Sequence, residues 1–150
     1  MSQPSETFHG GRPVPADELR RRSSGVRPGG RVFEVKTAAA TTAYGGELRI
    51  PVHPMAGSVS SMGVSYKLGP REKSREFVLP ISECGLSVVQ GTGKIRIGDE
   101  EHDFAVGDLA FIPVQGKFAI ENTGDEPMVM VGLISPPDAN ILRTAGLWME

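Results

Sequence analysis

Apolar and polar residues alternate with a period of two along most of the chain after Arg31, which is the pattern of β-strands with one buried face. Turn residues interrupt this alternation at short, even intervals. The pattern predicts strands at Val32–Lys36, Glu47–His53, Val59–Leu68, Glu76–Leu79, Leu86–Gln90, Lys94–Ile97, His102–Val106, Leu109–Ile112, Lys117–Asn122 and Met128–Ile134. Many short strands of even spacing indicate an all-β sandwich or barrel.

The connectors between these strands are short and rich in glycine and aspartate, for example Gly98-Asp99, Gly107-Asp108 and Thr123-Gly124-Asp125. Such residues tolerate the backbone angles of tight antiparallel reversals. Gly91-Thr92-Gly93 has the composition of a phosphate-binding loop, but it joins two strands and no helix follows it. We therefore interpret it as a turn, because a phosphate loop needs a helix N-terminus behind it.

The first 30 residues do not follow the alternation. Prolines and the Gly29-Gly30 pair interrupt any regular element there, so residues 1–30 are expected to form a flexible or draped basic leader ahead of a single domain over residues 31–150. Arg20-Arg21-Arg22 could contact phosphate. The favoured interpretation is a solvated charge cluster after a short helical turn at Asp17-Glu18-Leu19.

The composition narrows the classes of protein. A chain of 150 residues with a net charge of −2 and 39% hydrophobic residues fits one compact globular domain. Cys84 is the single cysteine, and no apolar run is long enough for a signal peptide or a membrane span, so we expect a cytoplasmic protein without a membrane partner. Beyond the leader the chain is acidic and has no basic groove lined with aromatics, so a nucleic-acid partner is not expected.

Two motif frames can be placed on the chain. Gly107, Pro113 and Asn122 fit G-x5-P-x-G-x2-H-x3-N without an insertion, and Gly91 ends the frame G-x5-H-x-H-x4-E-x6-G. These motifs describe the cupins, and the chain from about Leu68 to Pro137 resembles a small, single-domain bacterial cupin. The resemblance implies a jelly-roll β-barrel, with short extra helical turns at the termini.

The same resemblance implies a metal site whose ligands are replaced in this chain. Phe77, Leu79 and Phe118 stand at histidine positions, and Cys84 stands at the glutamate position. Phenylalanine and leucine offer no lone pair, and metal sites rarely survive with fewer than three protein ligands. We therefore expect no metal and no other cofactor. The histidines of the chain lie in the leader or in polar strand phases, which argues against a relocated site (His9, His53 and His102).

Alternate residues of barrel strands point inward, and this predicts the lining of the barrel. The inward set is Met62, Val64, Tyr66, Arg75, Phe77, Leu79, Cys84, Leu86, Val88, Ile95, Ile97, Leu109, Phe111, Phe118, Ile120 and Asn122, with Gln115 at the mouth. A mostly apolar lining with a few polar groups suits a small, largely hydrophobic ligand, and it equally suits a filled core. The expected substrate-binding residues are Met62, Arg75, Phe77, Leu79, Gln115, Phe118 and Ile120.

Tyr66 and Cys84 are the candidate catalytic residues. An inward phenol can donate to a carbonyl or protonate an enolate, or it can satisfy a neighbouring backbone group. A cysteine in an apolar barrel is either a nucleophile or a small buried hydrophobe. Arg75 can clamp a carboxylate or reach solvent at the rim.

Two functions remain open. The first is a metal-independent isomerase, cyclase or lyase acting on a small hydrophobic molecule of secondary metabolism, and the alternative is a non-catalytic binding or assembly module with a filled barrel. A cavity of roughly 300 Å³ or more between Tyr66, Cys84 and Phe118 would favour the enzyme. In the tail from Ser135 to Trp148, Ile141, Leu142, Leu147 and Trp148 supply apolar contacts, so the tail predicts either a homodimer or a tail folded over the barrel.

Overall fold

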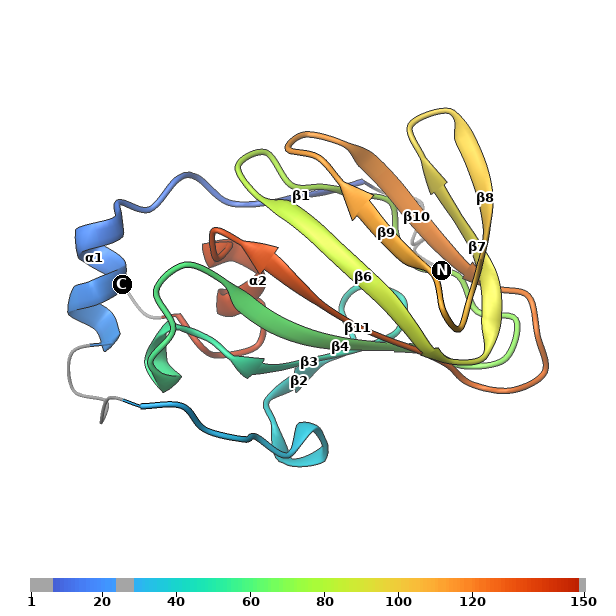
Figure 1. Cartoon of the computed structure of the whole chain (residues 1–150). Coiled ribbons are helices and arrows are strands. Elements are labelled where there is room, and N and C mark those ends of the chain that lie inside the picture. The colour runs from blue at the N-terminus through green and yellow to red at the C-terminus, as the bar shows by residue number, and fades with distance from the viewer. Residues whose placement is uncertain (1–6, 24–28, 149–150) are drawn as a thin grey trace.

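Two β-sheets face one another in this protein (Figure 1), for which a computed structural model describes residues 7–23 and 29–148. The five-stranded sheet has the order β1-β5-β10-β7-β8, and the six-stranded sheet has the order β2-β3-β4-β11-β6-β9. The strands are β1 (Phe8–His9), β2 (Ala40–Thr41), β3 (Glu47–Val52), β4 (Met62–Leu68), β5 (Phe77–Val78), β6 (Glu83–Gln90), β7 (Thr92–Ile97), β8 (Glu100–Ala105), β9 (Leu109–Ile112), β10 (Lys117–Asn122) and β11 (Met128–Ser135). The helices are α1 (Ala16–Ser23) and α2 (Ala139–Thr144), with 3-10 turns η1 (Val35–Thr37) and η2 (Pro54–Ala56). The predicted all-β jelly-roll barrel with minor helices is confirmed.

The strand register places the alternating apolar residues of neighbouring strands together on the inner face of the barrel. Residues directly opposite one another in a ladder point to the same face of the sheet. Met130 of β11 lies opposite Tyr66 of β4 and Val88 of β6, and all three side chains are buried. The predicted inward phase is therefore correct for β4, β6 and β10.

The predicted inward phase of β9 is wrong. Leu109 and Phe111 are 75% and 60% exposed, whereas Ala110 and Ile112 are buried. The reason is the register, because Ile112 lies opposite Cys84 and Phe111 lies opposite Gly85. All four residues of β9 are apolar, so the sequence alone carries no signal for the phase of this strand.

The predicted strand at Val32–Lys36 is also wrong. Residues 31–34 are irregular, Val32 is fully exposed, and Val35 begins the turn η1. Alternating apolar residues form a strand only where a neighbouring strand completes their hydrogen bonds, and none pairs with this segment among the described residues.

The described part of the leader lies against the barrel. Phe8 and His9 pair in parallel with Phe77 and Val78, and the buried side chain of Leu19 holds α1 against the core. Residues 7–23 therefore contact the barrel through β1 and Leu19. Within α1, Arg21 and Arg22 form ion pairs with Glu18, so their charges are engaged within the helix.

The tail folds over its own barrel, which is the second of the two predicted alternatives. The carboxylate of Asp138 caps α2 by accepting the Ile141 N–H at 3.0 Å, and Ile141, Leu142 and Trp148 are buried. In the described part of the chain, neither helix has the length and apolar character needed to cross a membrane.

Asn122, the last residue of the second motif, ties three chain segments together. Its side-chain amide donates to the carbonyl oxygens of Leu68, Gly69 and Glu126 at 3.2, 2.9 and 2.8 Å, and its Oδ1 accepts the Gly124 N–H at 2.9 Å. The side chain is fully buried. A buried amide with this many partners fixes the turn between β10 and β11 against the end of β4.

Replacing Asn122 by alanine should lower the free energy of unfolding by about 3 kcal/mol, because buried carbonyl and amide groups lose their partners. Chemical denaturation measures this change. Gln90→Ala, which removes the same type of side chain from an exposed position, should change it by less than about 0.5 kcal/mol. An equally small effect of Asn122→Ala would contradict the bracing role.

Candidate functional site

The space between the two sheets is nearly filled. A cavity of about 40 Å³ remains at its centre, far smaller than the roughly 300–1,000 Å³ of typical ligand pockets. The surface that the walls expose to the cavity is apolar. The lining residues come from both sheets and from α2 (Leu48, Val64, Tyr66, Phe77, Leu79, Cys84, Leu86, Phe118, Ile120, Ile134 and Ile141). Because the cavity is smaller than the roughly 300 Å³ expected for an enzyme pocket, this packing favours the filled-barrel alternative.

Most of the predicted site residues meet at this cavity. Tyr66 comes from β4, Cys84 from β6 and Phe118 from β10, and they line it together with Phe77, Leu79 and Ile120. Met62 is fully buried in β4 but does not line it. The antiparallel ladders explain this convergence, because they align the inward phases of strands that are distant in sequence.

Stacked phenylalanine rings occupy the middle of the barrel. The rings of Phe77 and Phe118 lie with centroids 5.1 Å apart and planes inclined by 23°. Tyr66 and Phe8 approach Phe77 edge-on, at 6.3 and 6.1 Å. These offset and edge-on arrangements are favourable for aromatic pairs. Two of the three residues that stand at histidine positions of the motifs, Phe77 and Phe118, therefore pack against each other.

Arg75 and Gln115 do not line the cavity, which corrects the expectation that they supply polar groups at its mouth. The Arg75 guanidinium donates to the Ala43 carbonyl at 3.2 Å, away from the barrel centre. The Gln115 side chain is exposed, and its backbone N–H donates to the Leu79 carbonyl at 2.9 Å. Both residues lie in loops, where the strand alternation used for the prediction does not hold.

Gln115 and Arg71 retain a backbone feature of the motifs. They are the two non-glycine residues with positive φ among those described, at 65° and 63°. In the alignment with the cupin motifs, both stand at glycine positions. Glycine adopts this conformation readily, whereas other L-residues do so at a cost of roughly 1–2 kcal/mol. The backbone path of the motif therefore persists without its glycines.

The hydroxyl of Tyr66 is already engaged. It donates to the backbone carbonyl of Tyr44 at 2.8 Å within the core. Burial raises the pKa of Tyr66 well above its ordinary value, and the nearby charge of Glu72 raises it further. Tyr66 is therefore a neutral phenol that can donate or accept a hydrogen bond but does not ionise at neutral pH.

Cys84 is a buried thiol. Burial raises its pKa to about 12, so the reactive thiolate is scarce at neutral pH. Among residues 7–23 and 29–148, no histidine or carboxylate that could remove the proton lines the cavity. The environment of Cys84 thus supports a neutral, space-filling group rather than a nucleophile.

The lining does not fit the metal that the cupin motifs imply. Of the described residues around the cavity, only Tyr66 and Cys84 carry side-chain donor atoms. Among residues 7–23 and 29–148, no three side chains of His, Cys, Asp or Glu are placed to hold a metal ion. A divalent site with three or four protein ligands cannot be assembled from one thiol and one phenol.

Ile141 lines the cavity but is not among the lining residues that the strand alternation predicts. Leu48 and Ile134 could have been found, because they lie in the alternating phases of predicted strands. Ile141 belongs to α2 and enters the lining because the tail folds back on the barrel. This contact makes α2 one wall of the cavity. No local pattern in the sequence predicts it.

Comparison with known proteins adds evidence from sequence. The family described as "Cupin domain" matches residues 83–134. The chain is 30% identical over 113 residues to "Polyketide synthase CurC" from Streptomyces cyaneus, which covers 74% of this chain and 71% of the relative.

Solved structures agree on the fold. KdgF from Halomonas sp. superposes with a TM-score of 0.64 at 18% identity, covering 76% of this chain and all of that protein. The polyketide cyclase RemF from Streptomyces resistomycificus superposes with a TM-score of 0.62 at 12% identity, covering 73% of this chain and 84% of RemF. With the two-sheet barrel, its motif frame and the relationship to CurC all in agreement, this chain belongs to the cupin superfamily.

Proposed function

We propose that this protein is a metal-independent cupin of polyketide-type secondary metabolism, which promotes isomerisation, cyclisation or elimination of a small, largely hydrophobic molecule. The observation that carries the proposal is the 30% identity to polyketide synthase CurC over 113 residues. The apolar centre of the barrel supports it, because such a lining excludes water and holds a hydrophobic chain by its shape.

Within this proposal, Tyr66 polarises a carbonyl group of the substrate. A neutral phenol can donate its proton in a hydrogen bond to the oxygen that becomes an enol or enolate, and this lowers the barrier to carbon–carbon bond formation or proton shift. The substrate oxygen would take the place of the Tyr44 carbonyl, which accepts this hydrogen bond at 2.8 Å. Phe77, Phe118 and Ile120 would hold the carbon skeleton, and Cys84 would shape the pocket.

Entry of a substrate requires the wall formed by α2 to move. The cavity of about 40 Å³ is too small for a molecule with a folded carbon chain. Ile141 is its only lining residue from a helix, and α2 is only six residues long. Displacement of α2 would enlarge the cavity without breaking a strand ladder, because α2 pairs with no strand.

The alternative is a non-catalytic module with a permanently filled barrel. The specific observation in its favour is the close packing of the stacked rings of Phe77 and Phe118 around the small cavity. In that case the outer surfaces of the barrel would carry the function. Ligand binding inside the barrel, measured by native mass spectrometry, separates the two functions.

The test is native mass spectrometry of the chelator-treated protein with a panel of linear poly-β-ketones and aromatic polyketides. We expect a one-to-one complex with at least one compound, and turnover of that compound should fall by about 10²-fold in Tyr66→Phe, as the loss of a proton donor predicts. Val64→Phe, which fills the cavity, should abolish the complex, whereas Val89→Phe on the exposed face should preserve it.

The possible contradictions are distinct. Absence of any complex would support the filled barrel, and a complex that survives Val64→Phe would place the ligand outside the barrel. Dependence of binding or turnover on added iron, zinc, nickel or manganese would contradict metal independence.

Cys84 should be almost unreactive in the folded protein. A rise of its pKa from 9.0 to about 12 lowers the thiolate fraction at pH 8 by about a thousandfold, so alkylation by iodoacetamide should be slower than in the unfolded chain by at least that order. Because the unfolded chain loses this proton first, stability should also fall as the pH rises from about 9 toward 12. Alkylation at comparable rates in both states would contradict the buried, neutral thiol.

We also propose that the chain forms a homodimer through the outer face of β6, β9 and β11. In this face, Phe111 and Leu133 flank Gly85 in one row of the ladders, and Leu109 and Val131 flank Ser87 in the next. A side chain at Gly85 would meet only one atom within 4.0 Å, so an open hollow lies between two exposed apolar side chains. A second copy related by a two-fold axis can place Phe111 into this hollow, which makes the face complementary to itself.

Sedimentation velocity tests this interface. The wild-type chain should sediment as a dimer at micromolar concentration, and the double variant Phe111→Ser, Leu133→Ser should be a monomer, because burial of large apolar side chains drives such association. Val106→Ser, in the turn between β8 and β9, removes an exposed valine outside this face and should leave the dimer intact. A monomeric wild type would refute the proposal.

A further inference from the structure

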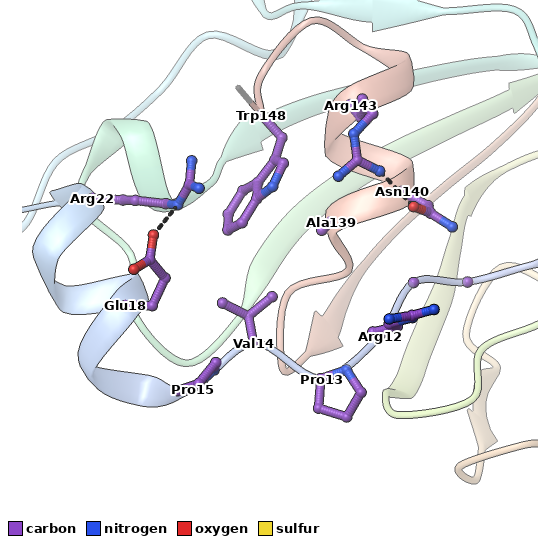
Figure 2. A pocket seen from close by; sticks show the side chains of 12 residues that line it. Arg12, Pro13, Val14, Pro15, Glu18, Arg22, Ala139, Asn140, Arg143 and Trp148 are labelled. Atoms are coloured by element: carbon purple, nitrogen blue, oxygen red, sulfur yellow. Dashed lines mark hydrogen bonds and ion pairs between the residues drawn. The ribbon is translucent and has the colours of Figure 1, made fainter. Parts of the chain in front are cut away.

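A second, larger pocket lies outside the barrel. It is a groove of about 590 Å³ between the leader and the C-terminal segment, with walls from Gly10 to Arg22 on one side and from Ala139 to Trp148 on the other (Figure 2). This volume falls within the range of ligand pockets. The groove and the barrel cavity lie on different sides of α2, because Asn140 and Arg143 line the groove whereas Ile141 lines the cavity.

The two walls of the groove are fixed relative to each other. The backbone N–H of Gly11 donates to Oδ2 of Asp138 at 2.7 Å, and the other oxygen of this buried carboxylate caps α2. A Cβ atom at Gly10 would lie 2.2 Å from the same carboxylate, so the chain can cross here only as glycine. The groove is therefore a preformed feature of the fold.

One end of the groove is cationic. Arg12 from the leader and Arg143 from α2 line this end together with Asn140, whose Oδ1 accepts from Arg143 Nη1 at 2.6 Å (Figure 2). Arg12 is exposed and makes no hydrogen bond or ion pair with any described residue. This concentration of positive charge occurs in a chain whose net charge is −2. A planar guanidinium without a partner is well suited to bind a carboxylate or a phosphate.

The other end of the groove combines apolar side chains with the ion pair of Arg22 and Glu18. Val14 and Pro15 face the indole of Trp148, which stacks against the Arg22 guanidinium at 3.7 Å from the ring centroid (Figure 2). Among the described residues, Glu18 supplies the single carboxylate of the lining, and this carboxylate accepts a hydrogen bond from Arg22 Nε at 2.8 Å. Its charge is therefore compensated locally and does not oppose an anion at the other end.

We propose that this groove binds a small organic anion. The acidic group of the ligand, a carboxylate or a phosphate, lies between Arg12 and Arg143, and its apolar body lies along Val14, Pro15 and Trp148. This site is separate from the barrel interior and does not depend on the proposed function, because none of these residues lines the barrel cavity.

The single tryptophan of the chain provides a direct measurement, since Trp148 lies in the groove. Titration of the full chain with cyclohexanecarboxylate or cyclohexyl phosphate should change the Trp148 fluorescence in a saturable way, and the tighter of the two identifies the acidic group. Cyclohexylmethanol, which keeps the ring and lacks the charge, should bind at least tenfold more weakly, because a charge-assisted hydrogen bond contributes that much.

Matched variants locate the site. Arg12→Gln should weaken binding of the better anion by about tenfold or more, whereas Arg20→Gln, with the same loss of charge on the exposed side of α1, should leave it unchanged. Val64→Phe, which alters only the barrel, should also leave it unchanged, so failure of this site is distinguishable from failure of the barrel proposal. No saturable change, equal binding of the alcohol, equal losses in the two arginine variants, or loss of the signal in Val64→Phe would each overturn the proposal.

Discussion

The register between β5 and β10 sets the packing at the centre of the barrel. It places Phe118 directly opposite Phe77, and β1 extends the same row by placing Phe8 beside Phe77. The three side chains come from segments that are far apart in sequence. They meet at the centre of the barrel because paired residues on neighbouring strands point to the same face of the sheet. The stacking of Phe77 on Phe118 fills the space that the cupin motifs assign to a metal, and the contact with Phe8 fixes the leader to the sheet.

Helix α2 lies between two sites, the barrel cavity beside this aromatic row and the groove outside the barrel. Ile141 lines the barrel cavity, whereas Asn140 and Arg143 of the same helix line the outer groove. Asp138 connects the two regions, since one carboxylate oxygen caps α2 and the other binds the backbone of the leader. The inner space is small, apolar and without ionised groups, and the outer space is large and cationic. These opposite characters follow from burial, because charge is tolerated only where water or a counter-ion remains.

The sequence predicted the elements well where the alternation was unambiguous and failed where it was not. β4, β6 and β10 carry clear polar and apolar phases, and their inward residues agree with the prediction. β9 consists of four apolar residues, so its phase came from pairing with β6, and Phe111 turned outward. Val32 had the alternation of a strand but no neighbouring strand to pair with in the described structure. For Arg75 and Gln115, strand alternation was extended into loops, where side-chain direction depends on the local backbone.

The barrel frame and the lack of metal ligands at its motif positions can be predicted from the amino-acid sequence. Both are local properties, because turn residues act on their own backbone and phenylalanine or leucine has no lone pair in any surroundings. The positive φ angles of Arg71 and Gln115 show how strongly that frame persists. Three features emerge only when the chain is folded: the small space that Phe77 and Phe118 leave, the position of Ile141 in the cavity wall, and the groove that Arg12 and Arg143 share. These depend on packing between segments that are far apart in the sequence, and no pattern within either segment specifies the other.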